Sequence, residues 1–406
     1  MYEINSQIDI PDHDFLENAL TVCMKERGLR LSNEIFKLKK ELELNTNAMA
    51  KHILAQYGIN NVNSPKQVLS YMQSNYDNEK LSVCTDERTG KLSSSKENMS
   101  LLAERGDTFA IDLLKYRKYS KQLEYINSLL GCSDRFGRVF PDVSFGATNR
   151  VNYSNPPIMN IPKEILWNVL RPYIDGNYLF SIDIKNQEPC VLINWLGIDS
   201  LKSKLSSENG LYFEIYREIF GKEPISVELK ELKTSWNALS YGSNLFGITP
   251  YCRNIDANKV YEYFTGIKEL KNYRGKAYGL ASNKVRRCST YFGTELYPDA
   301  RQQGQLQRQL MDFPVQGTCS DILALLVKRF YDYLTKHDLS EKLSLYYTRH
   351  DELIIEVDGV FFSEKGEESV KCLIGEILNH KVDDWTPFKT TITLVKSVNL
   401  QEVKEE

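Results

Sequence analysis

The sequence predicts a mixed α/β fold, in which an α/β platform is interrupted by a helical insertion and follows a separate helical part. A chain of 406 residues is too long for one simple core and favours two or three subdomains. Helical periodicity alternates twice with segments that are rich in turns and short apolar runs. Near the C-terminus, residues 345–347 and 353–357 are two strand-like runs separated by a polar trio.

The first 130 residues are expected to be mainly helical. Apolar residues between Ser32 and Leu54 fall near one helical face, and Ser32 is expected to be the N-cap. A second helix is expected at residues 68–72, followed by a polar loop over residues 78–98. Residues 112–130 then predict a helix that is rich in Lys, Arg and Tyr.

The pattern changes after Gly131. Residues 137–162 contain many turn residues and prolines and predict irregular structure or short strands. Residues 177–197 begin as a buried strand and become helical near Pro189, a residue that suits a first helical turn. Helices are expected to dominate residues 200–291, and residues 317–334 predict one further helix before the final strands.

Composition excludes several classes of protein. Hydrophobic residues make up 42% and charged residues 26%, which is ordinary for a soluble globular protein. The sequence contains no run of about 18 apolar residues, so no transmembrane helix is predicted. The acidic, polar N-terminus does not resemble a signal peptide. A cytoplasmic location without membrane partners is therefore expected. The eight cysteines form no C-x-x-C pair, and the five histidines show no zinc-ligand spacing.

Charge is unevenly distributed along the chain. The formal net charge is −3, which alone argues against nucleic acid as a partner. Between Thr265 and Leu310, however, nine basic residues face only three acidic ones. A local basic surface can bind phosphates although the whole chain is acidic. A solvated charged face explains the same pattern equally well.

Two groups of carboxylates stand beside predicted strands. Asp351 and Glu352 follow His350 between the two C-terminal strands, and Asp183 lies at the end of an apolar strand, five residues before Glu188. If the strands are neighbours, three carboxylates meet, and their repulsion requires hard divalent cations such as Mg²⁺. Two such ions activate a hydroxyl and stabilise a leaving pyrophosphate. On spacing alone, two unrelated surface groups remain the favoured interpretation.

Seven segments lie in order along almost the whole chain: "MKERGLRLSNEIFKLKKELE", "INNVNSPKQVLSYM", "TNRVNYSNPPIMNIP", "DIKNQE", "KTSWNALSYGSNLFG", "RQLMDFPVQGTCSDI" and "RHDELIIEV". Together they resemble the polymerase portion of family A DNA polymerases, the bacterial DNA polymerase I type. The first two resemble the thumb, and the others resemble the segment before motif A, motif A, motif B, the segment before motif C, and motif C. Chance is a poor explanation for seven matches in register.

The resemblance implies a right-hand architecture with an α+β palm and helical thumb and fingers. The thumb would cover residues 1–130, the palm residues 131–200 and 296–406, and the fingers residues 201–295. It implies a template-directed DNA polymerase that adds dNMPs to a primer 3′-OH. With only about 20 residues before the first thumb-like segment, no proofreading domain is expected.

The resemblance also implies roles for single residues in catalysis. Asp183 and Asp351 would bind two Mg²⁺ ions, for which Mn²⁺ could substitute, the Ile184 carbonyl would add a ligand, and Glu352 would support the site. The residues implied to bind the nucleotide are Glu188, Lys230, Lys233, Asn237 and Tyr241. Among them, Lys233 would neutralise the triphosphate, and Glu188 would occupy the space that a ribose 2′-OH needs.

Primer–template DNA and dNTPs are the implied partners, and the protein is expected to be a monomer. Residues implied to contact the primer terminus or the minor groove are Arg150, Arg308, Gln316 and His350. Thumb residues implied to hold duplex phosphates are Lys66, Arg117, Lys118 and Lys121. The minor groove presents a degenerate pattern, which suits an enzyme that must accept any correct base pair.

Most departures from the family pattern fall in the nucleotide pocket. Asn149 replaces a Gly, Tyr212 a His, and Leu229 an Arg, although Lys230 is adjacent. Asn237 stands where a Phe or Tyr usually meets the sugar. Because the metal carboxylates are intact, we expect the chemistry to survive, with unusual turnover, nucleotide affinity or sugar selection.

Two alternatives remain. A single-subunit RNA polymerase has a related palm and fingers, and "YGSNLFG" favours it, but Glu188 and the His350–Asp351–Glu352 trio favour a DNA polymerase. A non-catalytic DNA-binding relative is the second alternative. The intact carboxylates argue against it, because a protein that only binds DNA has no need of buried like charges.

Overall fold

The computed structural model describes residues 11–85, 90–378, 382 and 385–395. Packing divides the chain into two compact units. The first comprises Met1–Gly28, Pro141–Met159 and Pro172–Val395, and the second comprises Leu29–Phe140, Asn160–Arg171 and Lys396–Glu406. The expectation of a cytoplasmic location was based partly on the N-terminal segment. Most of that segment, residues 1–10, lies outside the described residues.

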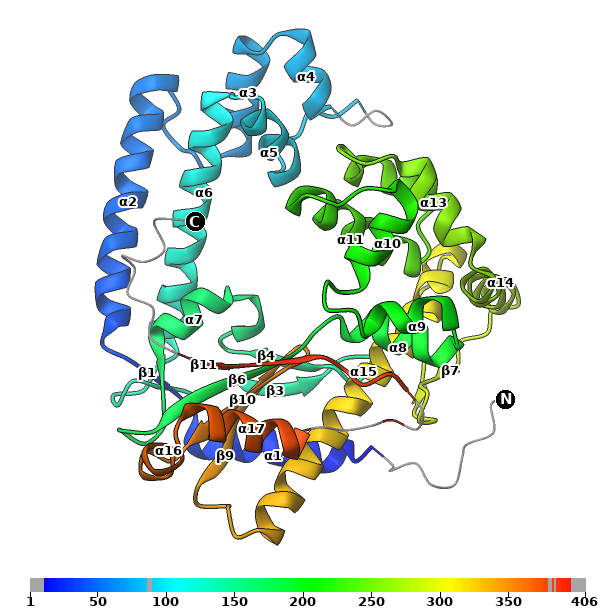
Figure 1. Cartoon of the computed structure of the whole chain (residues 1–406). Coiled ribbons are helices and arrows are strands. Elements are labelled where there is room, and N and C mark those ends of the chain that lie inside the picture. Colours follow the sequence, from blue (N-terminus) through cyan, green and yellow to red (C-terminus); the bar gives the residue numbers. More distant parts are fainter. Residues whose placement is uncertain (1–10, 86–89, 379–381, 383–384, 396–406) are drawn as a thin grey trace. The chain divides into compact units, whose positions relative to one another are not determined.

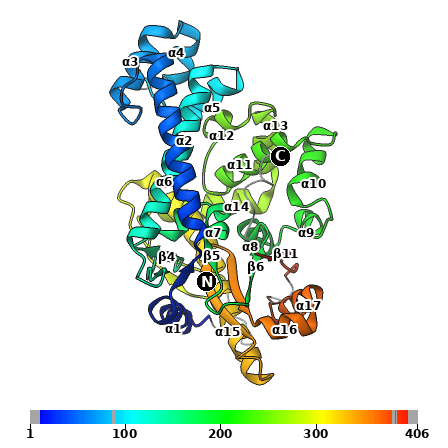
Figure 2. The same ribbon diagram turned by 90° about the vertical axis from the view of Figure 1, so that its left-hand side faces the viewer.

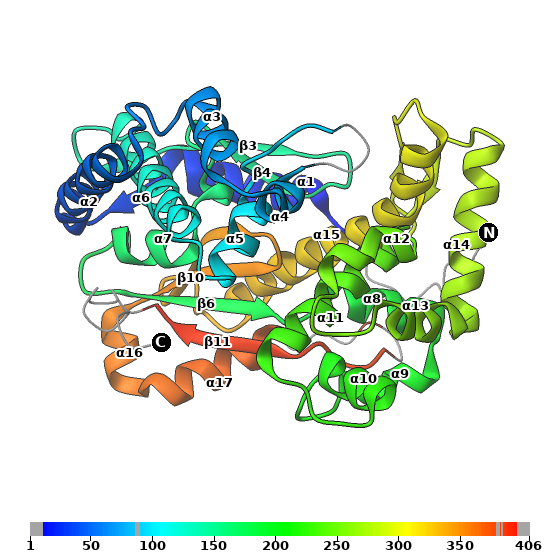
Figure 3. The ribbon, with the colours of Figure 1, turned by 90° about the horizontal axis from the view of Figure 1, so that it is seen from above.

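A four-stranded antiparallel sheet, in the order β11-β6-β10-β9, organises the first unit. Its strands are β6 (Tyr178–Ile184), β9 (Leu343–Arg349), β10 (Glu352–Val357) and β11 (Thr390–Leu394). The inner strands are rich in apolar and β-branched residues, and every residue of β10 is buried. Figure 3 shows β6 and β11 side by side. The predicted C-terminal strand–turn–strand and the predicted strand before Pro189 are confirmed.

Helices pack against this sheet and against one another. They are α1 (His13–Val22), the π-helical turn η1 (Cys23–Arg27), α8 (Gln187–Leu196), α15 (Gln303–Lys336), α16 (Gly359–Lys365) and α17 (Glu367–Leu378). Helix α17 contacts both β11 and α15, and it lies beside α16 (Figure 2). His13 Nε2 pairs with the buried carboxylate of Asp321 at 2.6 Å, which fastens α1 to α15.

Helix α15 is a 34-residue core helix that begins well before the predicted start at Gly317. One 18-residue window has a mean hydropathy of 1.3, so it is long and apolar enough to cross a membrane by composition. Yet 89% of that window is buried inside the protein. Its apolar residues therefore form the core of this unit. Pro314 lies inside the helix, and the Thr318 hydroxyl donates to the Pro314 carbonyl at 2.7 Å.

A run of helices follows α8, as predicted for residues 200–291. It comprises α9 (Asp199–Leu205), α10 (Leu211–Phe220), α11 (Ser226–Ser240), α12 (Leu245–Ile248), the 3₁₀ turn η3 (Thr249–Tyr251), α13 (Ala257–Gly266) and α14 (Lys268–Ser282). The carboxylate of Glu228 accepts from the Ile225 backbone at 2.9 Å and from Lys222 Nζ at 2.8 Å, so it caps the start of α11. Trp236 of α11 packs edge-on against Phe264 of α13.

Two short hairpins complete the first unit. They pair β3 (Asp142–Phe145) with β4 (Val151–Ser154), and β7 (Cys288–Ser289) with β8 (Glu295–Leu296). The 3₁₀ turn η2 (Ile158–Asn160) begins in this unit, after β4. The prediction of short strands among the turns of residues 137–162 is thus confirmed.

The second unit is mainly helical, as predicted for the first 130 residues. Its elements are β1 (Leu29–Leu31), β2 (Arg138–Val139), β5 (Leu170–Arg171), α2 (Glu34–Tyr57), α3 (Pro65–Asn75), α4 (Asn78–Cys84), α5 (Lys96–Glu104), α6 (Thr108–Gly131) and α7 (Lys163–Val169). The long helices α2 and α6 lie side by side (Figure 1). Tyr57, Tyr71 and Phe109 pack ring against ring in its core. The three strands form a small sheet in the order β2-β1-β5.

Two local predictions in this unit are wrong. Ser32 is not the N-cap of α2, because the helix begins after Asn33 and the Ser32 hydroxyl donates to the Asn168 carbonyl at 3.5 Å. The segment from residue 78 to 98 is not all loop, because Asn78–Cys84 forms α4, capped by Asp77. Residues 86–89 of that segment lie outside the described residues. The division by packing does not assign roles, so the palm, fingers and thumb boundaries remain predictions.

Candidate active site

The sheet brings the two predicted carboxylate groups together. Glu352, the first residue of β10, is the register partner of Asp183 on β6. The Ile184 amide donates to the Asp351 carbonyl at 3.2 Å, so the chain just before β10 also follows β6. The strand pairing on which the site depended is therefore present, with Asp183 beside the turn that carries Asp351.

Electrostatics at this edge favour a cation. Burial raises the pKa of the Asp351 carboxyl above its usual range, and the charges of Asp183 and Glu188 raise it further, while Arg150 opposes them. Two carboxylates that destabilise each other offer the oxygen donors that Mg²⁺ prefers. Within the described residues, no three His, Cys, Asp or Glu side chains form a complete metal cluster. Because Mg²⁺ commonly uses one or two carboxylates together with water and substrate phosphates, the pair fits such an ion.

Glu352 occupies a different environment from its neighbour Asp351. It is 5% exposed, and its carboxylate accepts a hydrogen bond from the Ser181 hydroxyl on β6. A buried carboxylate with such a donor is held in place by the sheet. This environment agrees with a supporting position beneath the site.

Three residues around the site adopt left-handed backbone conformations. The φ angles are 55° at Asn149, 52° at Asn186 and 52° at His350. Asn149 precedes Arg150, Asn186 is the N-cap of α8, and His350 turns the chain between β9 and β10. Asn tolerates this region better than most residues other than Gly, so the conformation explains why Asn149 can stand where the family pattern has Gly.

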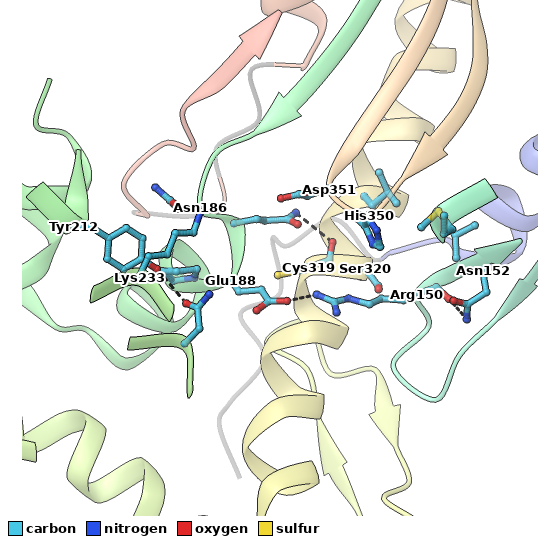
Figure 4. A pocket seen from close by; sticks show the side chains of 16 residues that line it. Arg150, Asn152, Asn186, Glu188, Tyr212, Lys233, Cys319, Ser320, His350 and Asp351 are labelled. Atoms are coloured by element: carbon cyan, nitrogen blue, oxygen red, sulfur yellow. Dashed lines mark hydrogen bonds and ion pairs between the residues drawn. The ribbon is translucent and has the colours of Figure 1, made fainter. Parts of the chain in front are cut away.

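A cavity of about 410 Å³ lies beside these residues (Figure 4). Of the predicted site residues, those that line it are Arg150, Glu188, Lys233, Asn237, His350 and Asp351. Sequence reasoning did not single out several others that line it, among them Asn152, Asn186, Gln187, Cys319 and Ser320. Cys319 and Ser320 belong to "QGTCSD", so their position within a matched segment was the signal that could have found them.

Glu188 is held firmly from two sides. Its carboxylate accepts hydrogen bonds from the Arg150 guanidinium and from the Tyr241 hydroxyl. Burial lowers the pKa of Arg150, but the charge and hydrogen bond of Glu188 outweigh burial and raise it overall. Burial and then Glu188 raise the pKa of Tyr241, which therefore stays a hydrogen-bond donor at neutral pH. The arrangement fixes a carboxylate at the wall of the cavity (Figure 4).

Helices α10 and α11 supply another wall. Lys233 and Asn237 lie one turn apart on α11, and the Tyr212 hydroxyl on α10 donates to Asn237 Oδ1 at 3.1 Å. Lys233 Nζ lies 5.9 Å from the centre of the Tyr212 ring. Lys230 is exposed on the same helix and does not line the described cavity.

A second cavity of about 520 Å³ collects the other predicted residues of this unit. It is lined by Tyr241, Arg308 and Gln316, together with Asp312 and Asp299. Burial raises the pKa of Asp312 to about 6, and the charge of Glu188 adds to the shift. Its buried oxygen Oδ1 has no hydrogen-bond partner among the described residues. Sequence reasoning missed Asp312, although it lies four residues from both Arg308 and Gln316 on α15.

The predicted phosphate-binding residues of the second unit differ in their freedom. The Arg117 guanidinium is tied to Ser94, donating to its carbonyl and, at 2.9 Å, to its hydroxyl. Lys121 forms an exposed ion pair with Glu124 at 2.8 Å. Lys66 and Lys118 are exposed. Their contact with duplex phosphates remains a prediction.

The basic segment of residues 265–310 is only partly exposed to solvent. Arg274 donates to the Ser243 carbonyl at 2.8 Å, which ties α14 to the loop after α11. Arg287 is paired with Glu295. Lys268, Lys271 and Lys276 are exposed along α14. The two interpretations of this segment, phosphate binding and a solvated face, therefore apply to the exposed lysines.

Comparison with known proteins identifies the fold. The chain superposes on the POL domain of Pol1 from M. smegmatis, solved in complex with DNA primer-template and dNTP, with a TM-score of 0.78 and 18% sequence identity. The match covers 96% of this chain and 70% of that chain. The two proteins therefore share one fold, a mixed α/β polymerase domain.

Sequence comparison gives the family. The profile of DNA polymerase family A matches residues 32–396, so the chain belongs to this family. It is 26% identical over 367 residues to DNA polymerase I of Caldicellulosiruptor bescii, covering 85% of this chain and 40% of that protein. It is 24% identical over 387 residues to the thermostable DNA polymerase I of Thermus filiformis, covering 88% and 44%. The chain thus spans less than half the length of these relatives.

Proposed function

We propose that the chain is a DNA-directed DNA polymerase that extends a primer by nucleotidyl transfer from dNTPs. The observation that carries the proposal is the meeting of Asp183 and Asp351 at one sheet edge, beside a cavity that also contains Lys233 and Glu188. Carboxylates for a cation, an ammonium for phosphates and a fixed carboxylate for the sugar are the groups that this reaction needs.

The reaction is the attack of the primer 3′-hydroxyl on the α-phosphate of the dNTP, with pyrophosphate as the leaving group. Asp183, Asp351 and the Ile184 carbonyl would hold two divalent cations, Mg²⁺ or in its place Mn²⁺. When bound, these ions activate the attacking hydroxyl and stabilise the charge on the leaving group. Glu352 supports the strand end, and the rest of the rate comes from holding the two reactants in line.

The nucleotide lies between α11 and Glu188. Lys233 offers a positive charge to the triphosphate, and the exposed Lys230 lies one turn earlier on the helix. Glu188, held by Arg150 and Tyr241, fills the space of a 2′-hydroxyl and thereby favours deoxynucleotides. Asn237 lines the same wall.

Primer–template DNA is the proposed macromolecular partner. Arg150 and His350 would contact the primer terminus, and Arg308 and Gln316 would contact the minor groove. In support of this, Arg308 and Gln316 line one cavity. The exposed Lys66 and Lys118 would hold duplex phosphates, with an affinity that falls as salt rises. Arg117, tied to Ser94, would act by holding the surrounding helices in place.

Primer extension tests the proposal directly. Labelled primers are annealed to DNA or RNA templates, and dNTPs or rNTPs are supplied separately with Mg²⁺. Extension on a DNA template with dNTPs alone is the expected result. Extension that requires rNTPs would support the RNA-polymerase alternative, and tight primer–template binding without extension by any nucleotide would support a non-catalytic DNA-binding relative.

Three further features belong to the same proposal. The family profile occupies residues 32–396, which leaves none of those residues for a separate nuclease domain, so this chain is proposed to extend without proofreading. A primer with a mismatched 3′ end should keep its length in Mg²⁺ without dNTPs. We also propose that the protein is a monomer in the cytoplasm without membrane contact. Light scattering of the chain with and without DNA measures the oligomeric state.

A further inference from the structure

The small sheet of the second unit has one apolar face and one face that carries a row of arginines. In the register of β1 with its two neighbours, Arg30 lies opposite Arg138 of β2 and opposite Arg171 of β5. Residues directly opposite each other in an antiparallel pair project to the same face. Because neighbouring strands are about 4.8 Å apart, the row spans about 10 Å of backbone. All three side chains are partly exposed, and the other face holds the buried residues Leu29, Leu31, Val139 and Leu170.

The row places like charges opposite each other, which destabilises a sheet. Arg138 also has a structural role, because its Nη2 and Nε lie 2.9 and 3.0 Å from Asp134 Oδ2. Asp134 accepts from the amides of Phe136 and Arg138 as well, each at 2.8 Å, so it fixes the turn before β2. A ligand with several negative charges at regular spacing would bridge the row and relieve its repulsion.

The turn before β2 adds an exposed aromatic ring beside the row. Phe136 is 60% exposed, and the guanidinium carbons of Arg135 and Arg138 lie 4.7 and 5.4 Å from its ring centre. A single exposed Phe is ordinary on a protein surface, but a ring with two guanidinium groups beside it is a set of planar, cationic stacking groups. Bases of single-stranded nucleic acids stack on aromatic rings and on guanidinium planes.

We infer that this arginine face, defined as Arg30, Arg138 and Arg171 together with Arg135 and Phe136, binds single-stranded nucleic acid. The row contacts successive phosphates, and the Phe136 turn receives a base. Phosphates and bases alternate along a single strand, so both parts of the arginine face match one ligand, whereas an acidic peptide offers the charges without the bases.

The arginine face is separate from the candidate active site. It lies in the second unit, and the two cavities described above are lined by residues of the first unit. It also differs from the lysines and arginine on α3 and α6 that are expected to hold duplex phosphates. The inferred activity is therefore an additional contact with single-stranded nucleic acid, beyond the proposed contacts with the primer–template duplex.

Fluorescence anisotropy of a labelled oligothymidylate tests the phosphate contacts, with the full chain, without dNTPs and over a series of salt concentrations. The double variant Arg30→Gln/Arg171→Gln leaves the Arg138–Asp134 pair intact, and its affinity should fall by about tenfold or more. The slope of log K against log salt should become shallower by about 1.4, because each single-strand phosphate contact contributes about 0.7. Arg105→Gln, at an exposed arginine of the same unit beside Glu79, is the matched control and should change neither quantity.

Phe136→Ser tests the stacking contact. Affinity for the oligothymidylate should fall by about five- to hundredfold, the loss of one base stacked on an aromatic ring, while the salt slope stays that of the wild type. Phe36→Ser is the matched control, because Phe36 of α2 is also 60% exposed in the same unit. A loss of equal size in Phe36→Ser would contradict a stacking role for Phe136.

Three results would overturn the inference. The first is an unchanged affinity and salt slope in the double arginine variant, and the second is an equal loss in Arg105→Gln. The third is a polyglutamate peptide that binds the wild type more tightly than the oligothymidylate through the same arginines, which would identify an acidic protein segment as the ligand.

Two further measurements separate lost binding from misfolding and from the proposed polymerase function. Without DNA, urea titration of the double arginine variant should give a free energy of unfolding equal to or above that of the wild type, because like charges are removed. A lower value would attribute the lost affinity to folding and contradict the inference. Single-nucleotide extension on a template with a one-nucleotide overhang should keep the wild-type rate at saturating primer–template. A loss of that rate as large as the loss of oligothymidylate affinity would place the arginines in the polymerase site instead.

Discussion

The carboxylates near the two ends of strand β10 lie in opposite electrostatic environments. At one end, Glu356 is 5% exposed and accepts hydrogen bonds from the Tyr173 amide at 2.9 Å, the Ile174 amide at 3.0 Å and Asn177 Nδ2 at 2.8 Å. At the other end, Asp351 is partly buried beside Asp183, and its pKa is raised by burial and by that charge. The fold thus stabilises a charge near one end of β10 and destabilises a charge on Asp351, the residue just before its other end.

The difference separates structure from function. A buried carboxylate with three donors holds a loop to the sheet and needs nothing else. A carboxylate beside another carboxylate lowers stability, and it is tolerated where a bound cation or substrate compensates for the repulsion. Glu188 is intermediate, because it has two donors and yet lines the cavity. Substitutions at the Asp183–Asp351 pair, at Glu188, at Glu356 and at Asp312 test this distinction.

The largest effect is expected at Asp351. Asp351→Ala, and equally Asp183→Ala, should reduce primer extension by about a thousandfold or more, because the cations that stabilise the transition state lose a ligand. Primer–template affinity should change little. Single-turnover extension and fluorescence anisotropy measure the two quantities. Near-normal extension by either variant would show that the pair does not hold the reacting metal.

Glu188 should show a smaller effect, on selectivity. Its loss opens the space beside the 2′ carbon, so Glu188→Ala should raise the use of ATP relative to dATP by roughly 5- to 150-fold, the equivalent of about 1–3 kcal/mol. The ratio of kcat/KM values opposite T measures it. If the ratio stays constant, Asn237 or Tyr241 carries the discrimination instead.

Glu356 should affect stability and leave catalysis intact. Glu356→Ala leaves the Tyr173 and Ile174 amides without their acceptor, so the free energy of unfolding should fall by about 2–4 kcal/mol. Urea titration measures the loss, and Glu368→Ala, at an exposed ion pair with Lys371, serves as the control that should change little. At about 20 °C, the primer-extension activity per folded molecule of this variant should equal that of the wild type. A loss of activity without a loss of stability would contradict the proposed contrast between the two ends of β10.

Asp312 should show the smallest effect, and it should depend on pH. The folded state keeps its proton up to a pKa of about 6, while the unfolded chain releases it near 3.8, so this group's contribution to stability is full below pH 3.8 and is lost as pH rises to about 6. Asp312→Asn removes this loss and should raise the free energy of unfolding at pH 8 by about 1–2 kcal/mol.

The comparison of pH 5 and pH 8 isolates Asp312 from the other groups near it. Glu188 and Arg150 face it from α8 and from the turn before β4, and Gln316 shares its helix. Asp299→Asn, an exposed carboxylate at the same cavity, is the matched control. A stability gain for Asp312→Asn that is the same at both pH values, or a gain of equal size for Asp299→Asn, would contradict the buried-charge explanation.

Sequence reasoning reached the strands and the carboxylates, because both have local signals. Short runs rich in apolar, β-branched and aromatic residues predicted β6, β9 and β10, and the polar trio between two runs predicted the turn at His350. It failed at Ser32, whose hydroxyl donates to the distant Asn168 carbonyl, while the helix begins after Asn33. It also missed α4, because the sequence of this short helix is mostly polar and resembles a loop. The helix is capped at its start by Asp77.

The side-chain pairs of the site have no local signal. The bonds of Glu188 to Arg150 and Tyr241 join residues 38 and 53 positions away, and the bond of Tyr212 to Asn237 joins two helices. Family resemblance supplied the members of the first set but not their contacts. The orphaned oxygen of Asp312 depends on what packs around α15, which only the folded chain specifies.

The left-handed backbone at Asn149, Asn186 and His350 limits which residues can replace them during evolution. A residue with a β-branch would cost roughly 1–2 kcal/mol at each position, whatever its side chain contacted. The residues found at these positions in related proteins should therefore be mainly Gly, Asn, Asp and His. Homologous sequences, once aligned, should show narrow substitution at these three positions even where neighbouring residues vary freely, and the narrowness would record backbone geometry as much as chemistry.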